Sequence, residues 1–211
     1  MKISLINGSQ KTGESNSGII LGRLLDLVKE KHEAKMYRPG VKLFSDETFA
    51  EIASGDAIVL AFPLFVDAIP SRTLEMLIEL ESAIKRRNAG NLIMYTIINN
   101  GFYEGKQNHV AFEIIEHWCE HSGVRFGGGI GQGAGEMIGL TKRYPINKGP
   151  FNNLDRALQA MIVKMEMKEP AGITYLSPYF PRFLWRWSGV RYWNSCARGN
   201  GLKKKDILRR L

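Results

Sequence analysis

The chain has 211 residues, of which 44% are hydrophobic and 24% charged, an ordinary balance for one globular α/β domain with a real core. Its two cysteines, Cys119 and Cys196, belong to no paired motif, which argues against a disulfide framework or an iron–sulfur site and favours a reducing compartment. No apolar run has the length of a signal peptide or a membrane span, so a cytoplasmic location is expected.

The net charge of +8 is unevenly distributed along the sequence. Residues 182–211 carry nine basic residues and one acidic residue, whereas residues 1–181 carry 20 of each sign and are neutral. The positive charge is therefore a local property of the C-terminal segment, and the function of that segment has to account for it.

Short apolar runs and amphipathic stretches alternate through the first 165 residues. The apolar runs predict buried strands at 2–7, 34–38, 56–62, 91–98 and 124–129. Helical periodicity predicts helices at 17–31, 46–53, 70–84, 107–121 and 154–165. This alternation predicts a doubly wound parallel sheet of five strands covered by helices on both faces, a three-layer α/β sandwich.

A hydroxyl-rich turn with two glycines follows the first predicted strand and ends where the next helix begins. Unpaired backbone N–H groups and the helix dipole favour an anion at that point. Gly8 and Gly13 have the spacing of a Walker motif, but Glu14 stands where that motif has its lysine. The turn is therefore predicted to bind a single phosphate monoester; the alternative is a plain polar turn with Ser15 as the helix N-cap.

Two further loops follow the third and fourth predicted strands, and parallel strands would bring all three loops to one edge of the sheet. Loop 63–70 is apolar and contains two prolines, which is typical of a stiff segment that covers a flat conjugated ring. Loop 99–105 contains two asparagines and glycines, which favour hydrogen bonds to a pyrimidine-like ring edge. The alternatives are that Phe65 packs under the next helix and that loop 99–105 is an ordinary turn.

Together these loops resemble the NAD(P)H-dependent FMN reductase branch of the flavodoxin-like superfamily over about residues 1–165. The resemblance is carried by Gly8-Ser9-Gln10-Lys11 with Ser15-Asn16-Ser17, by Pro63-Leu64-Phe65-Val66 with Pro70, and by Asn99 with Gly101-Phe102-Tyr103-Glu104. It implies a flavodoxin-like fold with strand order 2-1-3-4-5. It also implies three groups of cofactor-binding residues: Ser9, Lys11, Ser15, Asn16 and Ser17 for the FMN phosphate, Pro63, Leu64, Phe65 and Val66 along the flavin, and Asn99, Asn100, Gly101 and Phe102 at the ring.

The resemblance further implies an FMN-dependent oxidoreductase. Such an enzyme takes hydride from NADPH or NADH and passes it to a small-molecule acceptor such as a quinone, a nitro or azo compound, or a flavin. Because the flavin carries the chemistry, no catalytic side chain and no metal are expected, and the expected assembly is a homodimer or homotetramer. Two alternative functions are a flavodoxin-type electron-transfer protein without nicotinamide turnover and a binding protein whose flavin site is vestigial.

Two other motifs have plainer interpretations. His117-Trp118-Cys119-Glu120-His121 fits H-x-x-E-H, but without an evident third ligand it is interpreted as a solvated helix surface. The glycine-rich segment 129–134 fits a dinucleotide pattern, but no helix is predicted to open there. It is interpreted as a flexible loop near the site or at a subunit contact.

The expected boundary separates a flavin-binding domain at 1–168 from a basic aromatic C-terminal arm at 169–211. Segment 179–193 holds three of the four tryptophans, with arginines four apart and aromatics at helical spacing, which predicts an amphipathic helix. We favour an arm that packs on its own domain or on a neighbouring subunit, and the second choice is peripheral contact with an anionic membrane surface. Nucleic-acid binding is not expected, because the rest of the chain adds no net positive charge.

Overall fold

The computed structural model describes residues 1–39, 43–87, 91–203 and 206. It divides into two compact units, Met1–Pro178 and Tyr179–Leu211, which we call the body and the arm. The division follows the last strand of the sheet, whereas the boundary expected from the sequence, between residues 168 and 169, precedes that strand.

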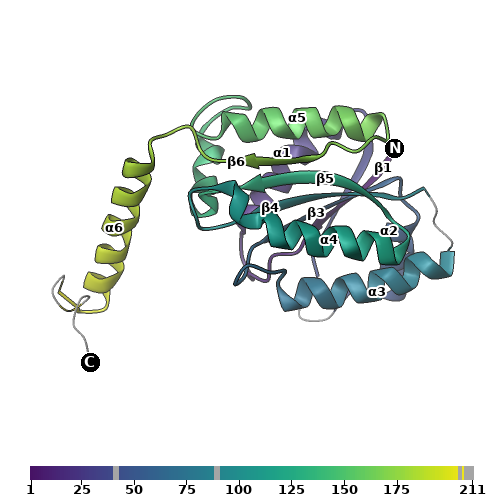
Figure 1. Ribbon diagram of the computed structural model, residues 1–211, viewed down its shortest axis with the longest axis horizontal. Helices are drawn as coiled ribbons and strands as arrows, with labels where there is room; N and C mark the ends of the chain where they lie inside the picture. Colours follow the sequence, from purple (N-terminus) through teal and green to yellow (C-terminus); the bar gives the residue numbers. More distant parts are fainter. Residues whose placement is uncertain (40–42, 88–90, 204–205, 207–211) are drawn as a thin grey trace. The chain divides into compact units, whose positions relative to one another are not determined.

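One parallel sheet of six strands, in the order β2-β1-β3-β4-β5-β6, forms the described body (Figure 1). The strands are β1 (Lys2–Asn7), β2 (Glu33–Tyr37), β3 (Ala57–Pro63), β4 (Ile93–Asn99), β5 (Arg125–Gln132) and β6 (Ile173–Leu176). This order confirms the predicted flavodoxin-like doubly wound sheet, but the prediction of five strands was wrong. The sixth strand is a four-residue edge strand with mostly exposed side chains, so it lacks the apolar run that marks a buried parallel strand.

Helices cover both faces of the sheet, which confirms the three-layer sandwich. Helices α1 and α5 lie on one face, and α2, α3 and α4 lie on the other (Figure 1). Their bounds are α1 (Asn16–Val28), α2 (Asp46–Ala53), α3 (Ser71–Arg87), α4 (His109–Ser122) and α5 (Asn152–Glu166), with short 3-10 segments η1 (Gly105–Asn108) and η2 (Gly135–Arg143).

The core is built on the two central strands. Every residue of β4 is buried, and so is every residue of β3 except Pro63. On one face Leu60 and Phe62 belong to a cluster with Leu80 of α3 and Phe112 of α4. Because these strands are packed from both sides, their carboxyl ends, where the three predicted loops begin, are held on a rigid platform.

The glycine run of segment 129–134 lies mostly inside β5, so the prediction of a flexible loop there was wrong. β5 pairs with β4 on one side and with β6 on the other. A Cβ atom on Gly129 would lie 1.8 Å from the carbonyl oxygen of Thr96, and one on Gly127 would lie 2.7 Å from the ring of Tyr95. The glycines are therefore explained by the close approach of β4 and of the Tyr95 side chain.

The arm contains helix α6 (Arg182–Gly199), which confirms the predicted helix in this segment (Figure 1). None of its 18 residues is buried. Among the residues that the structure describes, no helix combines the length and apolar character needed to cross a bilayer.

Candidate functional site

The turn after β1 is held in shape by the buried side chain of Asn7, the last residue of that strand. Asn7 Oδ1 accepts a hydrogen bond of 3.1 Å from the backbone N–H of Ser9, and Asn7 Nδ2 donates one of 3.1 Å to Ser15 Oγ. Ser15 Oγ is also the N-cap of α1, accepting from the N–H of Gly18 at 3.1 Å. One amide thus joins both ends of the turn, which therefore has its shape before any ligand binds.

The base of the turn is clamped between β3 and α3. The N–H of Gly8 donates to the carbonyl of Ala61 at 2.8 Å, and Thr73 Oγ1 donates to the carbonyl of Gly8 at 2.7 Å. A Cβ atom at residue 8 would lie 2.8 Å from Thr73 Oγ1. Only glycine fits at this position, because the threonine and β3 leave no room for a side chain.

The five residues predicted to hold a phosphate lie in the turn after β1 and at the start of α1, and of these Ser9 and Lys11 line the cavity described below. Ser9, Ser15 and Ser17 are buried, Asn16 is half-buried and Lys11 is exposed. Each buried hydroxyl already accepts a hydrogen bond within the protein: Ser9 Oγ from the N–H of Lys11 at 3.4 Å and Ser17 Oγ from Asn99 Nδ2 at 2.9 Å, besides the Ser15 cap. A hydroxyl that accepts one bond can still donate its own proton, so Ser9 and Ser17 keep the capacity to bind an anion, whereas Ser15 Oγ already donates to Asn7 Oδ1 at 3.4 Å.

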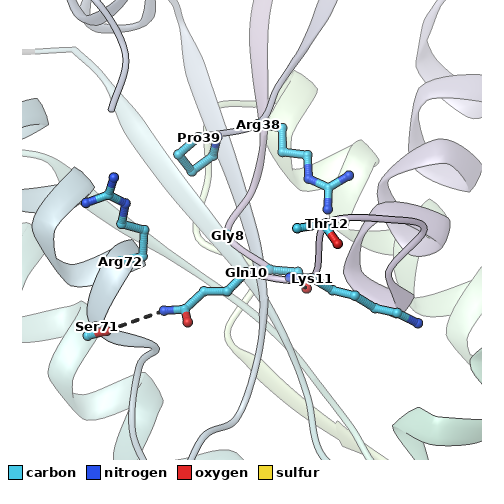
Figure 2. A pocket seen from close by; sticks show the side chains of 9 residues that line it. Gly8, Gln10, Lys11, Thr12, Arg38, Pro39, Ser71 and Arg72 are labelled. Carbon is cyan, nitrogen blue, oxygen red and sulfur yellow. Dashed lines mark hydrogen bonds between the residues drawn. The ribbon is translucent and has the colours of Figure 1, made fainter. Parts of the chain in front are cut away.

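A cavity of about 560 Å³ lies against this turn. Figure 2 shows the residues that line it: Gly8, Ser9, Gln10, Lys11, Thr12, Arg38, Pro39, Ser71 and Arg72. Three of these side chains are cationic and none is a carboxylate. In Figure 2 the Arg38 guanidinium points toward Thr12, and Gln10 and Lys11 extend in opposite directions. Charge and backbone geometry together favour an anion in this cavity.

Arg38 and Arg72 were not predicted from the sequence as site residues. Arg38 directly follows β2, and Arg72 lies in the first turn of α3, where it pairs with Glu75 at 2.6 Å. Arg38 forms no ion pair with any residue that the structure describes. Its place at the carboxyl end of a predicted strand, beside the first loop, is a signal that could have identified it.

A second cavity, of about 590 Å³, lies along the flank of α1 and shares Arg38 with the first. Its lining contains carboxylates as well as cations, among them Glu14 and Asp26. Glu14 is paired with Lys142 of η2. Since positive and negative groups are mixed here, the first cavity is the better site for a dianion.

The loops after β3 and β4 lie side by side, as predicted. Pro63 and Asn99 are partners in the sheet, and the N–H of Leu64 donates to the carbonyl of Asn99 at 2.8 Å. Beyond Leu64, which packs against the core, the chain makes a tight turn in which Val66 has a φ of 47° and is 99% exposed. A β-branched residue rarely adopts positive φ, so this turn stores backbone strain at the edge of the sheet.

The two asparagines of the third loop are buried and their amides point inward. Asn99 Nδ2 donates to Ser17 Oγ and, at 3.2 Å, to the carbonyl of Phe62. Asn100 Oδ1 accepts from the N–H of Phe102 at 2.9 Å. These amides hold the loops in place, while Gly101 and Phe102 are exposed. Neither of the two cavities is lined by residues 63–66 or 99–102, so the predicted contacts with a flavin ring stay predictions.

The H-x-x-E-H segment lies on α4, and its histidines contact carboxylates. His117 Nδ1 lies 3.3 Å from Glu120 Oε2, and His121 Nδ1 lies 2.9 Å from Glu81 Oε1 of α3. In the described parts of the chain no three potential metal ligands of this kind gather.

The chain matches no family model and no curated protein sequence. Its fold is similar to that of several solved structures. A putative quinone reductase from Klebsiella pneumoniae has a TM-score of 0.59 at 11% identity, over 81% of this chain and 86% of that one. An NADH:FMN oxidoreductase in its apo form has a TM-score of 0.54 at 11% identity, over 77% and 89%. The flavodoxin-like WrbA-like protein from Agrobacterium tumefaciens has a TM-score of 0.55 at 9% identity, over 79% and 96%. At these identities the similarity establishes the fold: the body is a flavodoxin-like α/β domain.

Proposed function

We propose that this protein binds FMN at the carboxyl edge of its sheet and acts as an FMN-dependent NAD(P)H oxidoreductase. The acceptor is a small molecule such as a quinone, a nitro or azo compound, or a flavin. The observation that carries the proposal is the preshaped turn 8–15, whose residues 8–12 line one cavity together with Arg38 and Arg72. Similar folds described as a quinone reductase and an NADH:FMN oxidoreductase support it.

The residues present fit the phosphate end of FMN. A phosphate monoester carries close to two negative charges at neutral pH, and the cavity lining offers three cations and no carboxylate. The start of the 17-residue helix α3, whose Ser71 and Arg72 line the cavity, adds a positive potential. Arg38 can bind phosphate oxygens through two N–H groups, whereas Lys11 offers a single point charge.

The ring end of FMN would use a different set of groups. Phe65 and Phe102 are 48% and 51% exposed on loops that begin at neighbouring strand ends. Aromatic side chains in that position can stack against or flank a planar heterocycle. The amides of Asn99 and Asn100 would act indirectly, because they fix the two loops that carry these rings.

When bound, FMN supplies the hydride chemistry, taking hydride from NADPH or NADH and passing it to the acceptor. The protein's own residues bind and orient the cofactor. Arg38, Arg72 and the turn fix its phosphate, and the platform of β3 and β4 fixes the loops at the other end. No side chain is required as a general acid or base, because the transfer needs position and electrostatic stabilisation from the protein.

The test is an absorption spectrum of the full chain after incubation with FMN and dialysis, followed by anaerobic addition of NADPH and then of a quinone. The proposal expects retained flavin absorbance, bleaching by NADPH or NADH, and recovery of the oxidised spectrum with quinone. A protein that stays colourless would contradict FMN binding. Retained flavin that dithionite bleaches but neither nicotinamide does would contradict the reductase and favour an electron-transfer protein.

A further inference from the structure

Helix α6 of the arm carries large exposed apolar side chains between Phe183 and Trp193, over the first two thirds of its length. Their exposed fractions include 70% for Phe183, 56% for Trp187, 51% for Val190 and 65% for Trp193. In a helix with 3.6 residues per turn, residues separated by three or four positions share a face. These four residues follow one another at intervals of four, three and three, so they share one side of the helix, which we call the α6 stripe, while the exposed Leu184 and Tyr192 lie on other sides.

Arginines lie beside and within the α6 stripe, and α6 contains no acidic residue. Its four basic residues are Arg182, Arg186, Arg191 and Arg198. Arg186 lies within the α6 stripe, three positions after Phe183 and four before Val190. Arg191 lies with its guanidinium 4.7 Å from the centre of the Trp187 ring. The cation therefore sits beside the stripe rather than on the opposite side of the helix, and its long apolar stem can lie along the same surface.

We propose that α6 lies on an anionic phospholipid surface, with the α6 stripe in the headgroup region and the arginines on lipid phosphates. Interfacial helices combine large apolar and aromatic residues with Lys or Arg at the margins, and they lie in the plane of the interface. The absence of acidic residues on α6 complements the negative surface potential of anionic lipids. Among the described residues no helix can span a bilayer, which is consistent with a surface position. This proposal does not depend on the proposed function.

The same observations give less support to two alternative occupants of the α6 stripe, a second copy of α6 and a nucleic acid. A second α6 would bring four arginines against four arginines with no acidic partner between them. A nucleic acid would meet positive charge only in the C-terminal segment, because residues 1–181 are neutral in sum. Lipid phosphates satisfy the arginines and the headgroup region accepts the aromatic rings, so one surface explains both features of the helix.

The test is sedimentation of the full chain with vesicles of phosphatidylcholine alone or with about one third phosphatidylglycerol. The proposal expects cosedimentation with the anionic vesicles only, weakened by salt. The tryptophan emission should shift to the blue, because three of the four tryptophans belong to α6 while Trp118 is buried in the body. Protein that stays in the supernatant with anionic vesicles at low salt would overturn the proposal.

Three double variants separate the contribution of the α6 arginines to vesicle binding from that of the α6 tryptophans. The Arg186→Glu/Arg191→Glu variant should weaken binding to anionic vesicles by at least about thirtyfold, because two favourable charges become unfavourable. The Trp187→Ser/Trp193→Ser variant should weaken it by about tenfold and remove the blue shift. Lys31→Glu/Lys106→Glu, which reverses two exposed charges of the body, is the control and should bind as the wild type does. If the tryptophan variant bound anionic vesicles as tightly as the wild type, this would contradict insertion of the α6 stripe into the headgroup region.

Two further measurements test whether a second copy of the chain or a nucleic acid covers the α6 stripe instead of lipid. Light scattering without vesicles would reveal a dimer that dissociates in the tryptophan variant, and such a dimer without vesicle binding would assign the α6 stripe to a second copy. Binding of a single-stranded oligonucleotide that exceeds binding to anionic vesicles at equal ionic strength would assign it to nucleic acid. Either outcome would overturn the lipid proposal.

Discussion

Asn99 Nδ2 donates a 2.9 Å hydrogen bond to Ser17 Oγ, which ties the end of β4 to the first turn of α1. Both residues are buried, with exposed fractions of 3% for Asn99 and 1% for Ser17. The bond joins the phosphate turn to the loop that is predicted to meet the flavin ring. This side-chain contact therefore adds to the pairing of β1, β3 and β4 in fixing the relative position of those two segments.

Replacing Ser17 with alanine is expected to lower the free energy of unfolding by about 1 kcal/mol, because Asn99 loses one of its two acceptors and keeps the carbonyl of Phe62. FMN affinity should fall as well, since the two loops lose their link. Urea unfolding and flavin titration measure the two effects. Ser82→Ala, which removes an exposed hydroxyl on α3, is the control. Unchanged FMN affinity in a destabilised Ser17→Ala protein would show that the bond serves stability alone.

Arg38→Ala is expected to weaken FMN binding by about tenfold or more, because charge-assisted hydrogen bonds to a phosphate are lost. Riboflavin, which lacks the phosphate, should bind the variant and the wild type equally. Fluorescence titration with both ligands gives the comparison, and Lys31→Ala provides a variant that removes a cation away from the cavity. If Arg38→Ala weakened riboflavin binding as much as FMN binding, Arg38 would not be a phosphate ligand.

Much of the fold was predictable because buried parallel strands and amphipathic helices leave strong periodic signals. The helix at 46–53 was predicted with the bounds that α2 has, and the central strands were predicted within two residues. The edge strand β6 was missed because its four exposed or half-buried residues carry no such signal. The glycine-rich segment 129–134 was interpreted as a loop because glycine is unfavourable in strands, and neighbours such as Thr96 at Gly129 and Tyr175 at Gly131 explain its glycines.

The candidate site was predictable in outline for the same reason, since the carboxyl ends of parallel strands meet at one edge. The turn after β1 and its N-cap Ser15 could be read from the sequence, and the binding of a phosphate by this turn stays a prediction. Arg72 could not be read in this way, because it reaches the cavity from α3, far from the turn along the chain, whereas Arg38 follows β2 at the carboxyl end of a predicted strand and had a signal there that was not used. The direction of the Asn99 amide likewise depends on tertiary contacts that no local pattern specifies, whereas the Asn100 amide bonds within its own loop.

The ionisation of Asp56 should make the free energy of unfolding depend on pH. The backbone N–H of Lys2 donates to Asp56 Oδ2 at 2.9 Å and Lys168 Nζ to Oδ1 at 2.9 Å, and these bonds lower the pKa of the carboxyl from its usual 3.8. A carboxyl whose pKa is lower in the folded state stabilises that state above its unfolded pKa and loses this contribution as the pH falls through the folded value.

The variant Asp56→Asn should therefore be less stable than the wild type near neutral pH, and the difference should shrink as the pH falls below 3.8. The midpoints of denaturant unfolding across the acid pH range measure this difference in stability. The control is Glu79→Gln, on the exposed surface of α3. A difference that stays constant down to the lowest pH at which the protein folds would show that the Asp56 charge is not its cause.

Arg23 and Asp155 form a bidentate ion pair that joins α1 to α5. Arg23 Nε donates to Asp155 Oδ1 at 2.7 Å and Arg23 Nη2 donates to Oδ2 at 2.6 Å. The side chains are 12% and 1% exposed, so each charge depends on the other for its solvation. The backbone N–H of Asn147 also donates to Asp155 Oδ2 at 2.7 Å, which extends the network to the loop before α5.

Asp155→Ala is expected to cost about 3–5 kcal/mol of unfolding free energy, because it leaves a largely buried guanidinium without its carboxylate. The double variant Arg23→Met/Asp155→Leu should recover much of that loss, since it removes both charges and keeps the volume. Urea unfolding of the two single variants and the double variant forms a complete cycle. A double variant as unstable as the sum of the single ones would mean that the two residues act independently and that α1 and α5 are held together by their apolar contacts.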